Sequence, residues 1–215
     1  MKGLLNLKYL VVAIGLGREP SRGLQKLVGK MAFCRMWAEA QKGKAFFVTA
    51  ENHDCLPGEF HLGLRNEAVM ERVCRFWVEE VHAYSPNAVK KYVDSLVHLT
   101  REKVGIICLA PLEKAAFQPD LVLVRCNPEQ AMLLLWSYAY NTGETIQGET
   151  GTAMCQTLVV KPYLQNKPSF SIGDPGGNYG VGLSSRELIV SVPYPLFKTM
   201  ISTLQKHIRD WKAGT

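Results

Sequence analysis

The chain has 215 residues, enough to bury a substantial hydrophobic core without disulfides or structural metals, and we expect one domain over residues 1–215. Hydrophobic residues make up 47% and charged residues 20% of it, a balance that excludes a disordered chain and a coiled coil. The net charge of +6 comes from scattered lysines and arginines rather than from one basic face, so nucleic acid is not an expected partner.

The N-terminus and the cysteines indicate a cytoplasmic protein. Asn6 and Lys8 interrupt the first apolar run and no small-residue cleavage site follows, so we interpret this run as a strand and not as a signal peptide. All apolar runs fall short of the roughly 18 residues of a membrane span, so no membrane association is expected. The six cysteines include no C-x-x-C pair and are too widely spaced for the disulfide framework of a small secreted domain, which favours reduced thiols.

Hydrophobic periodicity predicts the elements of the first half. In order, it predicts a strand, a helix, a strand, a loop and two helices, over residues 8–16, 24–41, 45–50, 51–63, 66–84 and 86–100. The first run is apolar throughout, which is typical of a strand buried on both faces. Pro57-Gly58 is expected to make a turn inside the loop. Asn66 and Ser85-Pro86 are the expected helix starts.

The second half mixes strands and helices without strict alternation. The predicted elements are two strands, a helix, a polar loop, a short helix, two strands and a final helix, over residues 104–109, 120–126, 128–140, 141–152, 152–161, 169–172, 187–192 and 195–211. The connection between the strands 104–109 and 120–126 contains two prolines and no helical period, which favours an antiparallel hairpin. We therefore predict an α+β fold in which helices pack on a mixed or antiparallel sheet.

The loop Glu51–Gly63 is the stretch that is richest in reactive groups. His53, Cys55 and His61 are ligands that suit zinc or iron, since a thiolate and imidazoles bind borderline metals well. Their H-x-C-x5-H spacing matches no standard metal site, however, and a tetrahedral site needs a fourth ligand from elsewhere. The alternative is that both histidines are partly exposed loop residues and Cys55 is a packed thiol.

Cys155 is the second candidate. It is predicted to lie in the first turn of a helix, where the pKa of a thiol is lowered and the thiolate can act as nucleophile or metal ligand. Alternatively, it is a small apolar residue that covers the sheet. Cys34 lies on a helical apolar stripe and by itself fits a core residue. The remaining three cysteines have apolar surroundings and are predicted to be core: Cys74, Cys108 and Cys126.

Two glycine-rich segments, Q-G-E-T-G-T and G-D-P-G-G-N-Y-G-V-G, can be plain turns or can hold an anion. Gly148, Gly151 and Thr152 precede a predicted helix, so their N–H groups are candidate donors to a ligand. Neither segment contains a P-loop or a dinucleotide fingerprint, and plain turns are the favoured interpretation. Asp174 and Glu149 are the carboxylates expected to face a pocket. The sequence has no G-x-S-x-G motif, so nothing in it favours a serine hydrolase.

Five segments together resemble a known family. They are F-C-R-M-W-A-E-A-Q-K-G-K, E-N-H-D-C-L-P-G-E-F-H-L-G-L, D-L-V-L-V-R-C-N-P-E-Q-A-M, G-T-A-M-C and R-E-L-I-V-S-V-P. Across nearly the whole chain, the sequence resembles the prokaryotic family named domain of unknown function 169. Its most characteristic parts are a cysteine followed by L-G-L, the N-P-x-Q-A-M helix start and the later lone cysteine. The resemblance implies a single cytoplasmic domain of a kind common in archaea and anaerobic bacteria.

The resemblance also implies a ligand set. Cysteines recur in this family at the places of Cys34, Cys55 and Cys155, and some relatives carry another cysteine in the segment around Asp174. Dispersed thiolates of this kind can hold an iron–sulfur cluster or a single iron or zinc ion. Asp174 is then a fourth ligand, and His53 and His61 are additional ligands or neighbours of the site. Such a site would support redox or Lewis-acid chemistry on a small molecule.

Two other functions stay open at this stage. The first is a metal-free module that binds a small anion, or a thiol enzyme, in which Cys55 or Cys155 remains a thiol. The second is a structural or partner-binding subunit. Tyr194 and Trp211, in and beside the last helix, suggest a dimer surface, so a homodimer is one expectation.

Overall fold

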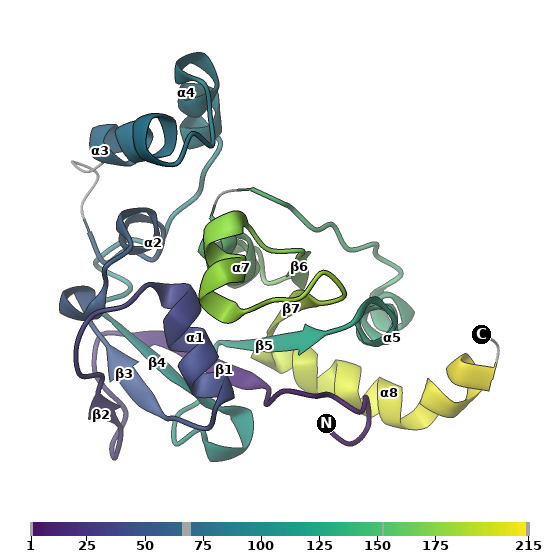
Figure 1. Ribbon diagram of the computed structural model, residues 1–215. Coiled ribbons are helices and arrows are strands. Elements are labelled where there is room, and N and C mark those ends of the chain that lie inside the picture. Colours follow the sequence, from purple (N-terminus) through teal and green to yellow (C-terminus); the bar gives the residue numbers. More distant parts are fainter. Residues whose placement is uncertain (1, 66–69, 152, 214–215) are drawn as a thin grey trace.

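The computed structural model describes residues 2–65, 70–151 and 153–213, and its strands form one seven-stranded mixed sheet (Figure 1). The strand order is β2-β3-β4-β1-β5-β7-β6. The bounds are β1 Val12–Gly17, β2 Gln25–Lys26, β3 Phe46–Val48, β4 Ile106–Pro111, β5 Leu121–Cys126, β6 Ser169–Ser171 and β7 Leu188–Pro193. Neighbouring strands are antiparallel except for the short β2–β3 pair. The predicted α+β class with a mixed sheet is therefore confirmed.

Helices cover both faces of this sheet. Their bounds are α1 Phe33–Gln41, α2 Leu56–His61, α3 Met70–Arg75, α4 Pro86–Asp94, α5 Pro128–Thr142, α6 Lys161–Gln165, α7 Pro175–Val181 and α8 Tyr194–Ala213. Two π-helical segments, η3 Phe76–Glu80 and η5 Gln156–Val160, continue α3 and precede α6. The described residues also include two 3-10 turns, η1 Ala50–Asn52 and η4 Leu112–Lys114.

The two faces of the sheet have separate cores. α5 and α8 lie side by side on one face, where they pack on Val122 and Val124 of β5 (Figure 1). α1, η5 and α7 cover the other face, where Leu123 belongs to the core. Successive residues of a strand point to opposite faces, so β5 serves both cores. A third cluster joins α2 to α3, η3 and α4, which extend away from the sheet in Figure 1.

β1 is the central strand, and its position overturns the predicted hairpin. β4 and β5 are not paired with each other; each is antiparallel to β1, with Val12 opposite Pro111 on one side and Leu123 on the other. The apolar run in β1 is buried on both faces, as expected. A strand with so little polar surface is stabilised most when it has a neighbour on both sides, and β4 and β5 are these two neighbours.

The helix predicted over 24–41 begins only at Phe33. Gly23 and Gly29 have φ values of +84° and +85°, a conformation that breaks a helix, and the chain between them is extended as β2. Val28, whose spacing fits the apolar face of the predicted helix, is 92% exposed. The apparent periodicity of residues 24–31 was therefore coincidental.

The stretch Glu51–Gly63 is largely helical and not a loop. Pro57 lies in the first turn of α2, where its missing N–H costs nothing, and Gly58 follows it inside the helix. The predicted turn at Pro57-Gly58 is therefore wrong. The next predicted helix, over 66–84, is observed from Met70 as α3 and η3, and its expected N-cap, Asn66, lies outside the described residues.

Ser85 caps α4 as predicted, with its hydroxyl accepting a hydrogen bond from Ala88 N, but α4 ends at Asp94 and not near residue 100. A later helix extends farther than predicted. Residues 154–165 are helical through Pro162, where the helix was expected to stop. The π turn of η5 ends at Val160, two residues before this proline, whose nitrogen cannot donate to the helix.

The glycine-rich segment G-D-P-G-G-N-Y-G-V-G forms α7, which corrects the expected turns. Asp174 caps the helix by accepting a hydrogen bond from Gly177 N at 2.7 Å, Pro175 is the first helical residue, and Gly182 ends the helix with φ +66°. This order of cap, proline and terminal glycine starts and stops a helix firmly enough to offset the poor helix propensity of its glycines.

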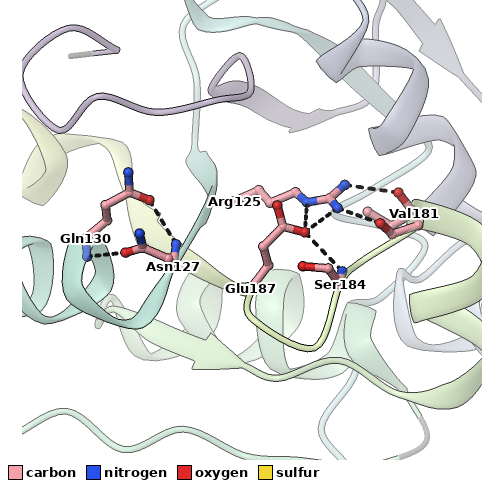
Figure 2. Close-up of polar contacts among 7 residues, drawn as sticks. Arg125, Asn127, Gln130, Val181, Ser184 and Glu187 are labelled. Atoms are coloured by element: carbon pink, nitrogen blue, oxygen red, sulfur yellow. Dashed lines mark hydrogen bonds and ion pairs between the residues drawn. The ribbon is translucent and has the colours of Figure 1, made fainter.

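A buried arginine anchors the far end of α7. The Arg125 guanidinium donates to the Val181 carbonyl at 3.1 Å, to the Gly182 carbonyl and to the Glu187 carboxylate, as Figure 2 shows. It also lies over the Tyr9 ring, 4.0 Å from its centroid. The same close-up shows the capping box of α5, in which Asn127 and Gln130 exchange hydrogen bonds.

Within the described residues, no helix combines the length and the apolar character that crossing a membrane requires.

Candidate functional site

A cavity of about 450 Å³ lies on the α1 side of the sheet, between α1, α2, η3, η5 and the start of α7. Its walls are mainly carbon, with the rings of Phe33, Trp37, Phe76 and Trp77 among them. This volume lies within the roughly 300–1000 Å³ that small-molecule sites occupy. We call it the cysteine cavity, because of the residues described next.

Three cysteines and one carboxylate line the cavity together. Cys34 is in the first turn of α1, Cys55 directly precedes α2, and Cys155 is in the first turn of the 154–165 helix. Asp174, the N-cap of α7, is the fourth. These are the three thiols and the carboxylate that the sequence singled out, and they come from four separate helix starts.

The other three cysteines are not among the residues that line the cavity. Cys108 and Cys126 are buried in β4 and β5, as predicted for core residues. Cys74 is half-buried in α3 and packs against the third hydrophobic cluster. The chain therefore provides an internal control set of three thiols away from the cavity.

Asp174 connects two helix starts. One carboxylate oxygen accepts from Gly177 N and the other from Met154 N, at 2.7 and 2.9 Å. Burial raises the pKa of this carboxyl group, while these backbone hydrogen bonds act in the opposite direction. Asp174 thus fixes the start of α7 relative to the turn that presents Cys155.

Burial raises the pKa of all three cavity thiols. Burial, followed by the neighbouring Cys55 and Asp174, raises the pKa of Cys34 to about 11, and burial likewise raises the pKa of Cys55. The pKa of Cys155 is raised well above its usual value by burial and by the same neighbours. The expected lowering of the Cys155 pKa at a helix start is therefore wrong, because desolvation outweighs the helix dipole at a buried position.

His53 and His61 are buried but do not line the cavity. Burial lowers the pKa of each imidazole to about 4, so both are neutral at pH 7. Neither ring forms a hydrogen bond to any residue in the described parts of the chain. The alternative of partly exposed loop histidines is thus excluded. His53 packs beside Cys55 against Gly58, whereas His61 stacks on the Trp77 ring.

The predicted glycine donors are not part of the cavity. Gly148 lies so close to the Phe170 ring that a Cβ there would overlap it, and a Cβ at Gly151 would lie 3.3 Å from the Tyr92 hydroxyl. Thr152 lies outside the described residues. Glu149 is exposed and forms an ion pair with Lys161, so it does not face the cavity as expected.

Among residues 2–65, 70–151 and 153–213, no group of three or more His, Cys, Asp or Glu side chains is arranged to hold a metal ion.

The profile of the family described as domain of unknown function 169, Uncharacterised ArCR, matches residues 1–203. The chain belongs to this family. Uncharacterized protein MJ0308 of Methanocaldococcus jannaschii is 22% identical over 216 residues, an alignment that covers 98% of this chain and 92% of the relative. No solved structure matches the chain.

In this family member, sequence reasoning missed the aromatic walls of the site. Trp37 and Trp77 are buried and Phe76 is half-buried, and all three have the helical spacing of ordinary core residues. The two π-helical segments were missed as well, although both η3 and η5 contribute cavity residues. π turns are rare and are frequent at functional sites, but they have no simple sequence signature.

Proposed function

We propose that the chain binds an iron–sulfur cluster in the cysteine cavity, ligated by Cys34, Cys55 and Cys155. The convergence of these three residues from distant segments on one cavity is the observation that supports this most. Dispersed cysteine thiolates are the usual ligands of such clusters. All six cysteines are free, which suits the reducing cytoplasm where we expect the protein to act.

A cluster suits ligands that lie farther apart than those of a single ion. Tetrahedral zinc, with Zn–S bonds of about 2.3 Å, requires sulfur atoms roughly 4 Å apart. A cluster places several iron and sulfide atoms between its ligands and so accepts thiolates from opposite walls of a cavity of about 450 Å³. The negative charge of three thiolates and Asp174 would also be offset by iron, since the described lining contains no lysine or arginine.

Asp174 is better explained as a positioning residue than as the fourth ligand. Both of its oxygens already accept backbone hydrogen bonds from Gly177 and Met154. We therefore expect three protein ligands and one iron position that is open to the cavity, where a small molecule would undergo Lewis-acid or redox chemistry.

The test is to express and purify the protein without oxygen and to measure iron, acid-labile sulfide and the visible and Mössbauer spectra. Stoichiometric iron and sulfide are expected in the wild type and in Cys108→Ala. Cys55→Ala is expected to lose most of both while keeping its far-ultraviolet circular dichroism. Wild-type protein that remains free of iron and sulfide, even after anaerobic reconstitution, would refute the proposal.

The metal-free alternatives have less support. A thiol enzyme needs a thiolate at neutral pH, whereas burial raises the pKa of all three cavity thiols. A small-anion site needs positive charge, and the described lining residues provide Asp174 but no lysine or arginine. A thiol enzyme would instead show one cysteine that is alkylated much faster than the others.

A further inference from the structure

We propose that Gly180 of α7 is a positioning residue for the Cys34 thiol. Because Gly180 has no side chain, the Cys34 Sγ lies against the backbone of α7, and the anchored helix holds the thiol in this place. The consequence for iron binding rests on the cluster proposed above, whereas the placement of the thiol does not.

The Cys34 Sγ occupies the space that a side chain at position 180 would need. A Cβ at Gly180 would lie 2.7 Å from this sulfur atom, 3.4 Å from the Arg35 Cγ and 3.6 Å from the Cys34 Cβ. Nonbonded carbon atoms are most stable at about 3.5–4.0 Å, and sulfur is larger than carbon, so a methyl group at 180 would overlap Sγ. The thiol is therefore the part of Cys34 that would have to move.

The helix α7 is held at both ends and does not readily move away from Cys34. At its start, Asp174 accepts a hydrogen bond from Met154 N at 2.9 Å. At its end, the Arg125 guanidinium donates to the Val181 carbonyl at 3.1 Å. Val181 directly follows the proposed positioning residue in the sequence. A side chain added at position 180 would therefore displace the thiol rather than the helix.

The backbone of Gly180 does not itself require glycine. Gly182 ends the helix with φ +66°, whereas Gly180 lies inside α7 without a positive φ, and glycine inside a helix is less favourable than alanine. At Gly176, in the same helix, a Cβ would lie 3.5 Å from the Asp174 Oδ1, an ordinary van der Waals contact. The close contact with a thiol thus explains glycine at 180 but not at 176.

This contact gives α7 control over one of the three proposed ligands. Cys34 lines the cavity and Gly180 does not, so the glycine acts on the thiol and not on a molecule in the cavity. Moving the thiol would leave the cluster with two correctly placed protein ligands, Cys55 and Cys155. We therefore expect a substitution at 180 to weaken cluster binding although no sulfur atom and no charge is removed.

The experiment measures urea unfolding of Gly180→Ala in two backgrounds, wild type and Cys34→Ala, after iron has been removed with a chelator and a reductant. Alanine stabilises a helix relative to glycine, so Gly180→Ala should raise the unfolding midpoint where residue 34 is alanine. With Cys34 present, the overlap should instead lower the midpoint. Gly176→Ala is the matched control in the same helix and should shift the midpoint equally in both backgrounds.

Two further measurements follow the thiol itself. Alkylation of Cys34 by iodoacetamide, measured by peptide mass spectrometry, should be at least about threefold faster in Gly180→Ala than in Gly176→Ala, because the thiol loses the helix that shields it. After purification without oxygen, iron and acid-labile sulfide should be at least about twofold lower in Gly180→Ala than in the wild type.

A midpoint shift of the same sign in both backgrounds, or equal alkylation of Cys34 in Gly180→Ala and Gly176→Ala, would overturn the inference. If Gly180→Ala does not fold, the double variant with Cys34→Ala decides, since a folded double variant supports the overlap and an unfolded one refutes it. Iron separates the two proposals. Wild-type protein without iron that still shows the reversal would refute the cluster alone, whereas wild-type levels of iron and sulfide in Gly180→Ala would refute the positioning role alone.

Discussion

The two faces of the sheet differ in how completely their polar groups are satisfied. On the α5–α8 face, Gln130 donates to the Leu5 carbonyl, Asn141 donates to Thr203, and no buried side-chain polar atom of the described residues lacks a partner. On the cavity face, Trp37 and Gln156 both have buried polar atoms without partners. Native proteins tolerate few such atoms, and they often mark sites of function.

The helices on the two faces differ in length. α5 and α8 are 15 and 20 residues long and pack along the sheet, whereas α1, α2 and α7 have 9, 6 and 7 residues. Short helices add little stability of their own and depend on their caps and anchors. The long helices thus provide a stable support, while the short ones bring their starts, and the residues located there, to one cavity.

The largest expected effect concerns the anchor of α7. Arg125→Met removes a buried cation, which leaves two carbonyls without this donor and Glu187 with only the Ser184 N–H, so we expect a loss of about 3–5 kcal/mol in the free energy of unfolding. Arg75→Met breaks the exposed pair with Glu71 and should cost less than about 0.5 kcal/mol. Urea unfolding measures both. Similar losses in the two variants would show that the cavity face does not depend on this anchor.

The helix caps on the two faces should differ in how much they stabilise the fold. Asp174→Ala leaves two buried N–H groups unpaired, those of Gly177 and Met154, and should destabilise by about 2–3 kcal/mol. Asn127→Ala removes the α5 cap on the opposite face and should cost about 1 kcal/mol. A smaller loss for Asp174→Ala than for Asn127→Ala would contradict its role in joining two helix starts.

Acid should lower the stability of the protein, because His53 and His61 on the cavity side are buried in their neutral form. Burial, with a smaller contribution from His98, lowers the pKa of His61 from 6.5 to about 4. The unfolded chain therefore takes up this proton first, so the stabilisation is complete above about pH 6.5 and decreases as the pH falls towards 4. Between about pH 7.5 and 5 this amounts to about 2 kcal/mol.

Urea unfolding of wild type and His61→Gln across this range isolates the contribution of His61. The variant should show a correspondingly smaller fall in stability at acid pH, while His53 continues to contribute in both proteins. Parallel pH profiles would mean that His61 is not buried in its neutral form.

The smallest effect is expected on the outer surface of the α5–α8 face. Trp136 and Trp211 stack with ring centroids 5.2 Å apart, and Trp136 is 45% exposed. A double-mutant cycle with Trp136→Ala and Trp211→Ala should give a coupling of about 0.5–1.5 kcal/mol. A concentration-dependent coupling, together with dimers in analytical ultracentrifugation, would instead support the expected dimer surface near Trp211.

Much of the fold was predictable because local signals and tertiary packing agree. The apolar run of β1, the N-P-x-Q start of α5 and the amphipathic pattern of α8 each favour the structure that the chain adopts. The strand order was not predictable, because the pattern of β4 and β5 records burial but not which strand lies between them. The α7 helix was missed, although Asp174-Pro175 and Gly182 are a recognisable start and stop, because its glycines suggested turns.

For the site, the sequence indicated the residues but not their environment. The family resemblance implied Cys34, Cys55, Cys155 and Asp174, and the structure places all four at one cavity. Four other candidates do not line this cavity: His53, His61, Gly148 and Gly151. The raised thiol pKa values and the aromatic walls depend on which segments pack around them, which a single sequence does not specify. Trp37 in particular has the same helical spacing as an ordinary core residue.

The most direct test of the account compares two triple variants purified without oxygen, one lacking the cavity thiols (Cys34→Ala, Cys55→Ala, Cys155→Ala) and one lacking the others (Cys74→Ala, Cys108→Ala, Cys126→Ala). Iron, sulfide and visible absorption are measured on both and on the wild type. The account predicts cluster in the wild type and in the second variant, and none in the first. Equal iron content in both variants, or none in the wild type, would contradict it.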